Sequence, residues 1–437
     1  MSASPRVLTD WNPENRETWR PAIAWGTLAI TTYSMVMAFC VWFLVSAIAP
    51  KLNDIGFHLS KGQQYWLVAM PGLSCGLIRL VYMFLPPIVG TRRLIGYSSL
   101  LYALPMIGWF FAVQSTQTSY GVLLGLAFAC GIGGGSFSGY MPSTGYFFPR
   151  RLQGTALGIQ AGIGNLGMSI IQLVGPLLMG FGLFGMTWAA PQRQASGPIW
   201  VHNAAVFFVP WTLLAALLAF TLLKDVPVKA NVRQQLDIFS NPDTWIMTLM
   251  YVMTFGVFSG FSAQFALIIN TSYGKDSAFK GMEGLPAGAG YAFLGPLIGS
   301  LVRFAWGPLC DRFGGALWTL VSGVGMAVTL GWAALFLDPT RPDQFPVFLT
   351  AMLLMFFFTG VGNAGTFKQM PMIMPRRQAG GAIGFTAAVA SLGPFIVGVA
   401  LSSMDASLWF WLCAAYCLAC AAICWFRYAR PGAPFPG

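Results

Sequence analysis

The sequence has few charged residues, few cysteines and almost no histidine. Of its 437 residues only 8% are Asp, Glu, Lys or Arg, where soluble domains contain about 25%, and 56% are hydrophobic. So little charge cannot cover the surface of a water-soluble globule. Eight cysteines in so long a chain exclude a small disulfide scaffold, and 36 Phe and 16 Trp exclude a disordered chain. The composition therefore predicts an integral membrane protein.

Apolar runs of about 20 residues, the length a helix needs to cross a hydrocarbon core of roughly 30 Å, occur twelve times. These runs are too long for barrel strands, so the fold class predicted is an all-α membrane protein with 12 transmembrane helices. The predicted spans are 24–49, 65–89, 94–114, 119–147, 155–183, 201–223, 244–270, 286–309, 314–337, 346–374, 379–403 and 408–427.

Lysines and arginines are distributed unequally between the two sets of loops. Fifteen of the 24 fall on the side of the N-terminus and six on the other side. Because positive residues are retained in the cytoplasm, both termini are predicted to be cytoplasmic. The net charge of +11 thus reflects topology and does not indicate a nucleic-acid partner. The three remaining cations, Arg79, Arg303 and Lys368, fall inside predicted spans.

Two stretches of the chain repeat at nearly the same offset. "PRRLQGTALGIQAGIGNLG" from Pro149 matches "PRRQAGGAIGFTAAVASLG" from Pro375, and "LIRLVY" around Arg79 matches "LVRFAW" around Arg303. Twelve helices in two pseudo-symmetric six-helix halves form the major facilitator arrangement, whose binding site lies at the midplane between the halves. The predicted segments are a cytoplasmic lead-in (1–23), an N-terminal half (24–223), a cytoplasmic linker (224–243), a C-terminal half (244–427) and a cytoplasmic tail (428–437).

Metal and cofactor chemistry finds little support in the sequence. Cys413, Cys417, Cys420 and Cys424 recur at helical spacing, but no histidine accompanies them, so we interpret them as packing residues and predict no metal site. A haem or quinol enzyme would need several intramembrane histidines, and an ATP-driven pump would need a phosphate loop. The chain is therefore predicted to be a transporter without cofactors and not an enzyme.

Arg79 and Arg303 are the main functional candidates. A cation at membrane depth costs several kcal/mol, and all thirteen Asp and Glu residues fall outside the predicted spans, so no buried carboxylate is expected to neutralise it. The structural alternative is that helix carbonyls or a tyrosine satisfy the two side chains. The functional interpretation is that two planar guanidinium groups face each other and bind a small flat anion. Nitrate and nitrite fit that description better than phosphate.

Glycine-rich segments accompany these spans, with eleven glycines in 131–167 and seven in 360–393. Small residues such as Gly164 and Gly362 let helices approach and slide, and we expect both to serve gating. Packing alone does not explain Asn165 and Asn363, which offer amide donors at membrane depth.

These segments, with "GIGNLG" in the first and "GVGNAGTF" in the second, resemble the nitrate/nitrite porter (NarK-type) family of the major facilitator superfamily. "GLIRLVYMFLPPIVGTRR" in the second span and "GSLVRFAWGPLCDRFGG" in the eighth extend the resemblance over nearly the whole chain. The resemblance implies that Arg79 and Arg303 bind the anion, and that Asn165 and Tyr251 donate hydrogen bonds to it.

The resemblance also assigns aromatic and gating residues. It implies that Phe137 and Phe255 sandwich the flat anion and that Phe39 gates it. In "GPLCDRFGG", Asp311 and Arg312 would brace one conformation, whereas the equivalent loop of the first half, "GTRRLIGY", has lost its Asp. The loss of this Asp puts in doubt that both halves brace the conformation in the same way.

Two coupling modes remain open. Inward movement of an anion against an inside-negative potential costs about 2.3 kcal/mol per 100 mV, so uptake requires coupling. Nitrate/nitrite antiport moves no net charge and needs no buried acid. Nitrate/proton symport would need a titrating group, and a buried Lys368 near two arginines could serve, since His58 and His202 fall on the non-cytoplasmic side. Lys368 could instead reach the cytoplasmic headgroups.

The expected setting is the cytoplasmic membrane of a bacterium. The predicted partners are nitrate, nitrite, protons in the symport alternative, and the lipid bilayer, with a monomer as the functional unit. The remaining alternatives are another small-monoanion transporter, a multidrug exporter of the same fold and a sensor that does not transport.

Overall fold

The computed structural model describes residues 6–182, 189–194, 197–227, 236–375 and 378–433. Within them twelve helical stretches are long and apolar enough to cross a membrane, which confirms the predicted fold class. The first half contains α1 (Pro21–Trp42), α2 (Leu44–Leu52), η1 (Asn53–Ile55), α3 (Lys61–Tyr82), α4 (Pro86–Val89), α5 (Thr91–Ala112), α6 (Tyr120–Gly135), α7 (Phe137–Gly145), α8 (Arg150–Met179), α9 (Asn203–Val206) and α10 (Val209–Leu222).

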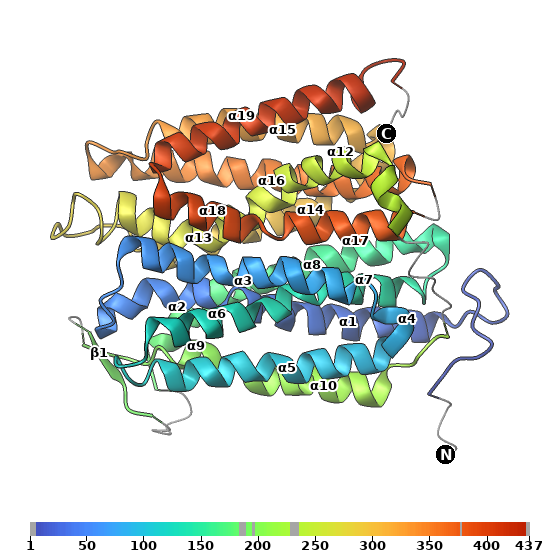
Figure 1. Cartoon of the computed structure of the whole chain (residues 1–437), viewed down its shortest axis with the longest axis horizontal. Coiled ribbons are helices and arrows are strands. Elements are labelled where there is room, and N and C mark those ends of the chain that lie inside the picture. The colour runs from blue at the N-terminus through green and yellow to red at the C-terminus, as the bar shows by residue number, and fades with distance from the viewer. Residues whose placement is uncertain (1–5, 183–188, 195–196, 228–235, 376–377, 434–437) are drawn as a thin grey trace.

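The second half repeats this pattern of long helices. It contains η3 (Leu236–Ser240), α12 (Pro242–Tyr251), the π-helix η4 (Val252–Gly256), α13 (Val257–Ser272), η5 (Gly288–Gly290), α14 (Leu294–Phe313), α15 (Gly315–Ala334), η6 (Pro342–Gln344), α16 (Phe345–Ile373), α17 (Ala379–Ala390), α18 (Gly393–Ser403), α19 (Ala406–Cys424) and the π-helix η7 (Trp425–Ala429). All the long helices run along one axis of the molecule (Figure 1).

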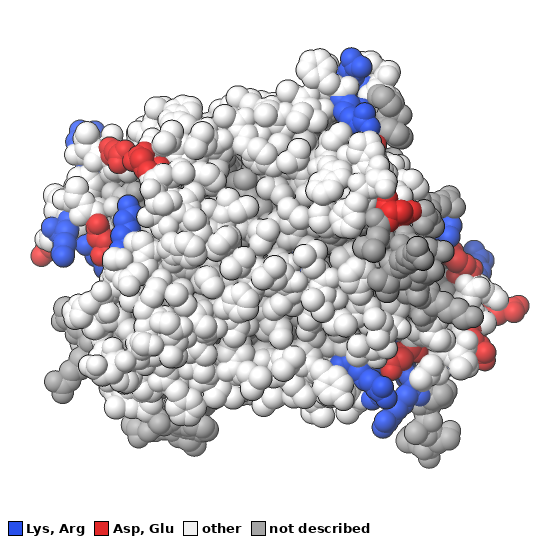
Figure 2. All heavy atoms as spheres, viewed as in Figure 1, with Lys and Arg blue, Asp and Glu red and all other residues white. Residues whose placement is uncertain are grey.

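Both ends of the chain lie at the same end of the molecule (Figure 1). We call this end, which carries Arg92 and Arg427, the terminal end, and the opposite end, which carries Asp54 and Lys275, the distal end. Figure 2 shows that charged side chains gather at these two ends, while the described residues in the broad middle of that face show none. Large apolar side chains such as Leu104 and Val328 are exposed, as a lipid-facing surface requires.

Two local features differ from a purely helical chain with a free lead-in. A short antiparallel hairpin, β1 (Gln192–Gln194) with β2 (Gly197–Ile199), lies between α8 and α9. The lead-in folds against the terminal end, where the indole nitrogens of Trp11 and Trp19 donate to the carbonyls of Tyr146 (3.1 Å) and Phe147 (3.0 Å). Parts of the predicted lead-in (1–5), linker (228–235) and tail (434–437) lie outside the described residues.

The loops before α5 and α15 are equivalent in backbone shape but not in sequence. Gly90 and Gly314, which precede these helices, have φ of +84° and +86°, a conformation that favours glycine. Asp311 lies three residues before Gly314, whereas its counterpart in the first half is Pro87. Asp225, three residues after the sixth span ends at Leu222, takes its place near Gly90. Its carboxylate accepts from the Arg92 amide (2.9 Å) and lies 3.6 Å from the Arg92 side chain.

The two halves meet through α3 against α18 and α8 against α14. Among the described residues, the hydrogen bonds between the halves lie from the middle of the molecule to the distal end. They join Tyr65 to Thr271 and Gln264, Arg79 to Ala387, Ser169 to Phe293, Gln172 to Ser262, and Lys275 to Pro50 and Asp54.

Toward the terminal end, α8 and α14 diverge. Gly162 packs against Phe304, since a Cβ built on it would lie 3.2 Å from the Phe304 Cβ. Gly158 and Gly154 follow on the same face of α8, because residues four apart share a helix face. A Cβ at either position would have no neighbour within 4 Å. The contact between the halves is therefore tight at the middle and distal levels and loose at the terminal end.

Candidate substrate-binding site

Arg79 is fully buried near the end of α3 and is held by two backbone carbonyls. Its Nε donates to Gly134 O at 3.0 Å, and its Nη1 donates to Ala387 O of the other half at 2.9 Å. Its Nη2 is buried and has no partner among the described residues. The structural alternative considered above, satisfaction by helix carbonyls, thus accounts for two of the three nitrogens and leaves one donor free.

Arg303 occupies the equivalent position on α14 but is bonded less. The residue is 5% exposed, and neither Nη1 nor Nη2 has a hydrogen-bond partner among the described residues. The repeat that relates Arg303 to Arg79 also relates Ala161 to Ala387. No hydrogen bond from Arg303 to the Ala161 carbonyl occurs in the described part of the chain. Arg303 therefore presents the pair of donors that a bidentate oxyanion contact requires.

Aromatic rings connect the two arginines. The Arg79 guanidinium carbon lies 4.6 Å from the ring centroid of Phe137 and 5.5 Å from that of Phe255. Phe255 stacks on Tyr251 with centroids 5.3 Å apart and planes 9° apart. Tyr251 lies 6.1 Å from Phe367, whose ring lies 5.0 Å from the Arg303 guanidinium carbon. Both cations thus border one continuous set of rings.

Three further buried donors lack partners. Asn165 on α8 and Asn363 on α16 are fully buried, and neither amide makes a hydrogen bond in the described part of the chain. The Tyr251 hydroxyl is likewise buried and unpartnered. Asn165 lies one turn from Gly162, which contacts Phe304, the residue after Arg303. Asn363 lies one turn from Phe367 on the same helix.

An unsatisfied buried polar group costs about 1–3 kcal/mol. A cluster of unsatisfied donors therefore indicates a place where a ligand completes the hydrogen bonding. Every one of these groups offers an N–H or O–H donor, and two carry a permanent positive charge. Among the described residues no carboxylate forms an ion pair with either arginine. The chemistry that fits is a small anion with several acceptor oxygens.

The backbone is irregular where the site forms. The π-helix η4 follows Tyr251 directly and contains Phe255, so both side chains project from a wider helical turn. The fourth span breaks at Ser136, between Gly134, whose carbonyl accepts from Arg79, and Phe137. Phe39 is buried against Phe137 with centroids 6.2 Å apart. These breaks bring a carbonyl and aromatic faces toward the cations.

Of the two alternatives left open for Lys368, burial within the membrane is the one that the structure contradicts. Its side chain is 41% exposed and forms an ion pair with Asp311 of α14. The Lys368 ammonium group thus pairs with a carboxylate and not with lipid headgroups. The proton-coupling role required a buried Lys368, and the exposed side chain does not meet that requirement. Arg312 contacts the Phe313 ring at 5.1 Å.

Gly164 and Gly362 pack within their own halves. A Cβ at Gly164 would lie 2.7 Å from the Met35 sulfur of α1, and Gly362 approaches Ser322 and Thr254. All eight cysteines are free and buried, and no group of metal ligands occurs among the described residues.

Comparison with known proteins places this chain in a family. The Major Facilitator Superfamily model matches residues 31–337. A protein of Thermus thermophilus named probable nitrate/nitrite antiporter NarK2 is 56% identical over 400 residues, covering 90% of this chain and 89% of its own length. The nitrate/nitrite transporter NarU of Salmonella typhimurium is 32% identical, covering 97% and 96%. The chain belongs to the nitrate/nitrite porters of the major facilitator superfamily.

Solved structures agree on the fold of this porter. The inward-open xylose transporter XylE from E. coli superposes with a TM-score of 0.66 at 14% identity, covering 95% of this chain and 96% of that one. An inward-facing bacterial homologue of the human lysosomal transporter Spinster gives 0.66 at 14%, covering 92% and 96%. At such identities the likeness concerns the fold alone.

Three members of the candidate site were not found from the sequence. Trp42, 5.8 Å from the Arg79 guanidinium carbon, and Phe367 are two among many aromatics, and nothing in the sequence distinguishes Trp42. The carbonyl of Ala387 belongs to the backbone and carries no residue signature. Phe367 alone had a usable signal, since it lies in the second glycine-rich segment one turn from Asn363.

Proposed function

We propose that the protein is a secondary transporter that exchanges nitrate for nitrite across the cytoplasmic membrane of a bacterium. The observation that carries this proposal is the pair of membrane-buried arginines whose free Nη atoms have no carboxylate partner among the described residues. The relatives named as nitrate/nitrite antiporter and transporters support the same substrate. Transport requires no covalent chemistry of the protein, so the function is not enzymatic.

In this proposal the anion lies between the two cations. Arg303 contacts two of its oxygens through Nη1 and Nη2, and Arg79 contributes its one free nitrogen, Nη2. Asn165 and Tyr251 donate from the sides. The rings of Phe137 and Phe255 lie near Arg79 and cover the flat faces of the anion. Asn363 offers one more amide donor from α16.

Gating is assigned to residues around this site. Phe39, stacked on Phe137, would move with α1 as the halves rock. Asp311, with Arg312 beside it, ties α14 to α16 through Lys368 at the terminal end. Gly164 and Gly362 allow α8 and α16 to lie close to their neighbours.

Exchange is favoured over proton symport by charge. An empty site holds two unneutralised guanidinium groups at membrane depth, and moving them across the potential without an anion is unfavourable. Nitrate for nitrite returns the carrier with its charge balanced. Symport depended on a buried Lys368, and because the Lys368–Asp311 pair is exposed, that residue no longer supports symport.

We further propose that the terminal end faces the cytoplasm and that one chain is the functional unit. The distribution of basic loops supports the orientation. The whole set of donors and rings comes from one chain, which supports a monomer.

The test is counterflow in proteoliposomes with the membrane voltage clamped. Vesicles preloaded with nitrite are expected to accumulate labelled nitrate with no pH gradient imposed. Empty vesicles serve as the control and should accumulate none. Nitrate entry that depends on an inward proton gradient and ignores internal nitrite would replace antiport by symport, and absence of nitrate movement under both conditions would overturn the function itself.

A further inference from the structure

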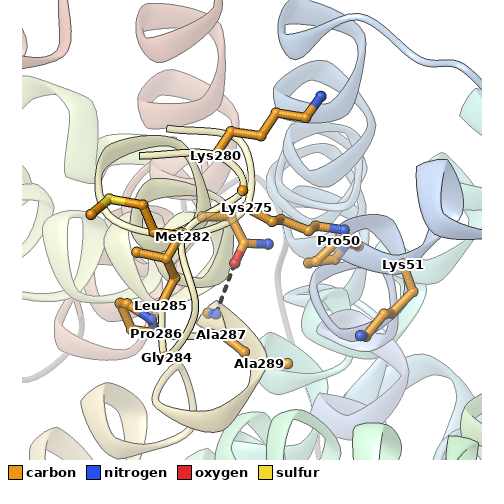
Figure 3. A pocket seen from close by; sticks show the side chains of 13 residues that line it. Pro50, Lys51, Lys275, Lys280, Met282, Gly284, Leu285, Pro286, Ala287 and Ala289 are labelled. Atoms are coloured by element: carbon orange, nitrogen blue, oxygen red, sulfur yellow. Dashed lines mark hydrogen bonds between the residues drawn. The ribbon is translucent and has the colours of Figure 1, made fainter. Parts of the chain in front are cut away.

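A cavity of about 490 Å³ lies between the two halves at the distal end. Pro50 and Lys51 of α2 line it from the first half, and Asn270, Lys275, Lys280 and Gly288 line it from the second. Figure 3 shows the Lys275 side chain directed at Pro50, and Lys51 is the next residue of α2. In the part of the chain that the structure describes, the lining contains three lysines and no carboxylate.

Lys275 also joins the halves at this point. Its Nζ donates to the Pro50 carbonyl at 3.0 Å and forms an ion pair with Asp54. Asn270 shapes the opposite wall, because its Oδ1 accepts from the Gly288 amide at 2.8 Å (Figure 3). The cation that holds the distal end together thus forms part of the wall of the cavity.

The charge around Lys275 is only partly balanced. Asp54 is shared by two ammonium groups, because Lys51 Nζ lies 3.6 Å from its second oxygen. Asp276, the residue after Lys275, lines a second, smaller cavity of about 200 Å³. Burial raises the pKa of the Asp276 carboxyl, although Lys275 opposes the shift. Clustered charge of one sign in a concave surface raises the local concentration of counter-ions.

We propose that this cavity is a reception site for a small oxyanion, distinct from the midplane site, and that its occupant competes with Asp54 for Lys275. The proposal rests on nitrate as the substrate proposed above. An anion that draws the Lys275 ammonium away from Asp54 and Pro50 removes two of the contacts between the halves at the distal end. Arrival of substrate is thereby linked to opening of that end.

The experiment measures the separation of the distal ends by labels on Gln117→Cys and Asp338→Cys, exposed positions in the distal loops of the two halves. It uses an Arg303→Lys background, in which the midplane site is disabled, in lipid nanodiscs. Sodium nitrate replaces sodium gluconate at constant ionic strength. The expected result is that nitrate lengthens the distance, that Lys275→Gln abolishes the response, and that Lys275→Arg restores it.

Lys61→Gln is the matched control, because Lys61 is a distal lysine that does not line this cavity. It should leave the response as it is in the Arg303→Lys background. An unchanged distance on nitrate addition, or a response that survives Lys275→Gln, would overturn the reception site. Failure of the midplane site is recognised separately, since it appears in the counterflow assay of the unsubstituted protein and not in these labels.

Discussion

At the scale of single residues, Arg79 and Arg303 are equivalent in the repeat but unequal in their bonding. Arg79 donates through Nε and Nη1 to the carbonyls of Gly134 and Ala387, while both terminal nitrogens of Arg303 have no partner within the described ranges. Arg79 therefore also links the halves, and we propose that Arg303 is the principal anion contact. Similar sequence around the two arginines thus conceals a division of roles.

We expect Arg303→Lys to reduce nitrate transport most strongly and Arg79→Lys also to reduce it. A lysine keeps the charge but loses the planar fork, and the loss of one charge-assisted hydrogen bond costs about 1.5–3 kcal/mol, or roughly 10- to 150-fold in KM. Initial rates of nitrate uptake in proteoliposomes measure this. Arg341→Lys, an exposed distal arginine paired with Asp343, is the control and should transport normally. Wild-type rates in Arg303→Lys would contradict the two-arginine site.

Lys368 provides a second residue-scale prediction. Because its side chain is 41% exposed and paired with Asp311, Lys368→Gln should leave the pH dependence of nitrate/nitrite exchange unchanged. The measurement is the exchange rate across a series of pH values with equal pH on both sides. A pH profile that flattens or shifts in the variant would return Lys368 to the coupling mechanism.

At the scale of elements, the break between α6 and α7 is held by hydroxyl groups. The Tyr102 hydroxyl donates to Ser136 Oγ at 2.5 Å and lies 2.8 Å from the Tyr140 hydroxyl, and Ser136 Oγ donates to Ile132 O at 2.9 Å. Ser136 separates the carbonyl of Gly134 from the ring of Phe137, and both contact Arg79. The α5 helix thus positions the Arg79 side of the site.

Tyr102→Phe is therefore expected to raise the KM for nitrate while leaving the maximal rate nearly unchanged. Removing one hydrogen bond costs about 1 kcal/mol, which corresponds to roughly a 5-fold change in KM. Tyr273→Phe loses a comparable bond, from its hydroxyl to Phe336 O at 2.5 Å, far from the arginines. Equal kinetics in the two variants would mean that Tyr102 has only a general structural role.

At the scale of the whole molecule, the halves are joined from the middle to the distal end and diverge at the terminal end. A Cys at Gly158, which has no neighbour within 4 Å of its Cβ position, should therefore react with a membrane-impermeant thiol reagent applied to the terminal end. The unsubstituted protein is the control, since its eight cysteines are all buried. Modification from the distal side alone would show that the protein rests in the opposite conformation.

The spans and the repeat could be read from the sequence because the bilayer imposes them. Twelve apolar runs became twelve spanning helices, with ends displaced by a few residues, as where the fifth span begins at Arg150 and not at 155. Pattern could not reveal the breaks inside spans, such as Ser136 and η4, because they follow from packing against other helices.

The candidate site was likewise predictable from the sequence only in part. A permanently charged side chain within a predicted span is conspicuous whatever surrounds it, so Arg79 and Arg303 were identified from the sequence, and the family resemblance added Asn165, Tyr251, Phe137 and Phe255. Pattern did not indicate Trp42 and Phe367, because every span contains aromatics and only folding places particular rings beside a cation.

The sequence by itself determined the membrane fold, the repeat and the two buried cations, because bilayer thickness and the cost of buried charge act on local composition. Only the tertiary structure decided what each cation contacts. Arg79 bonds to carbonyls 55 and 308 residues away, and Lys368 meets Asp311 57 residues away. Hydrogen bonds form between neighbours in space, and in a bundle of long helices those neighbours are distant in the chain.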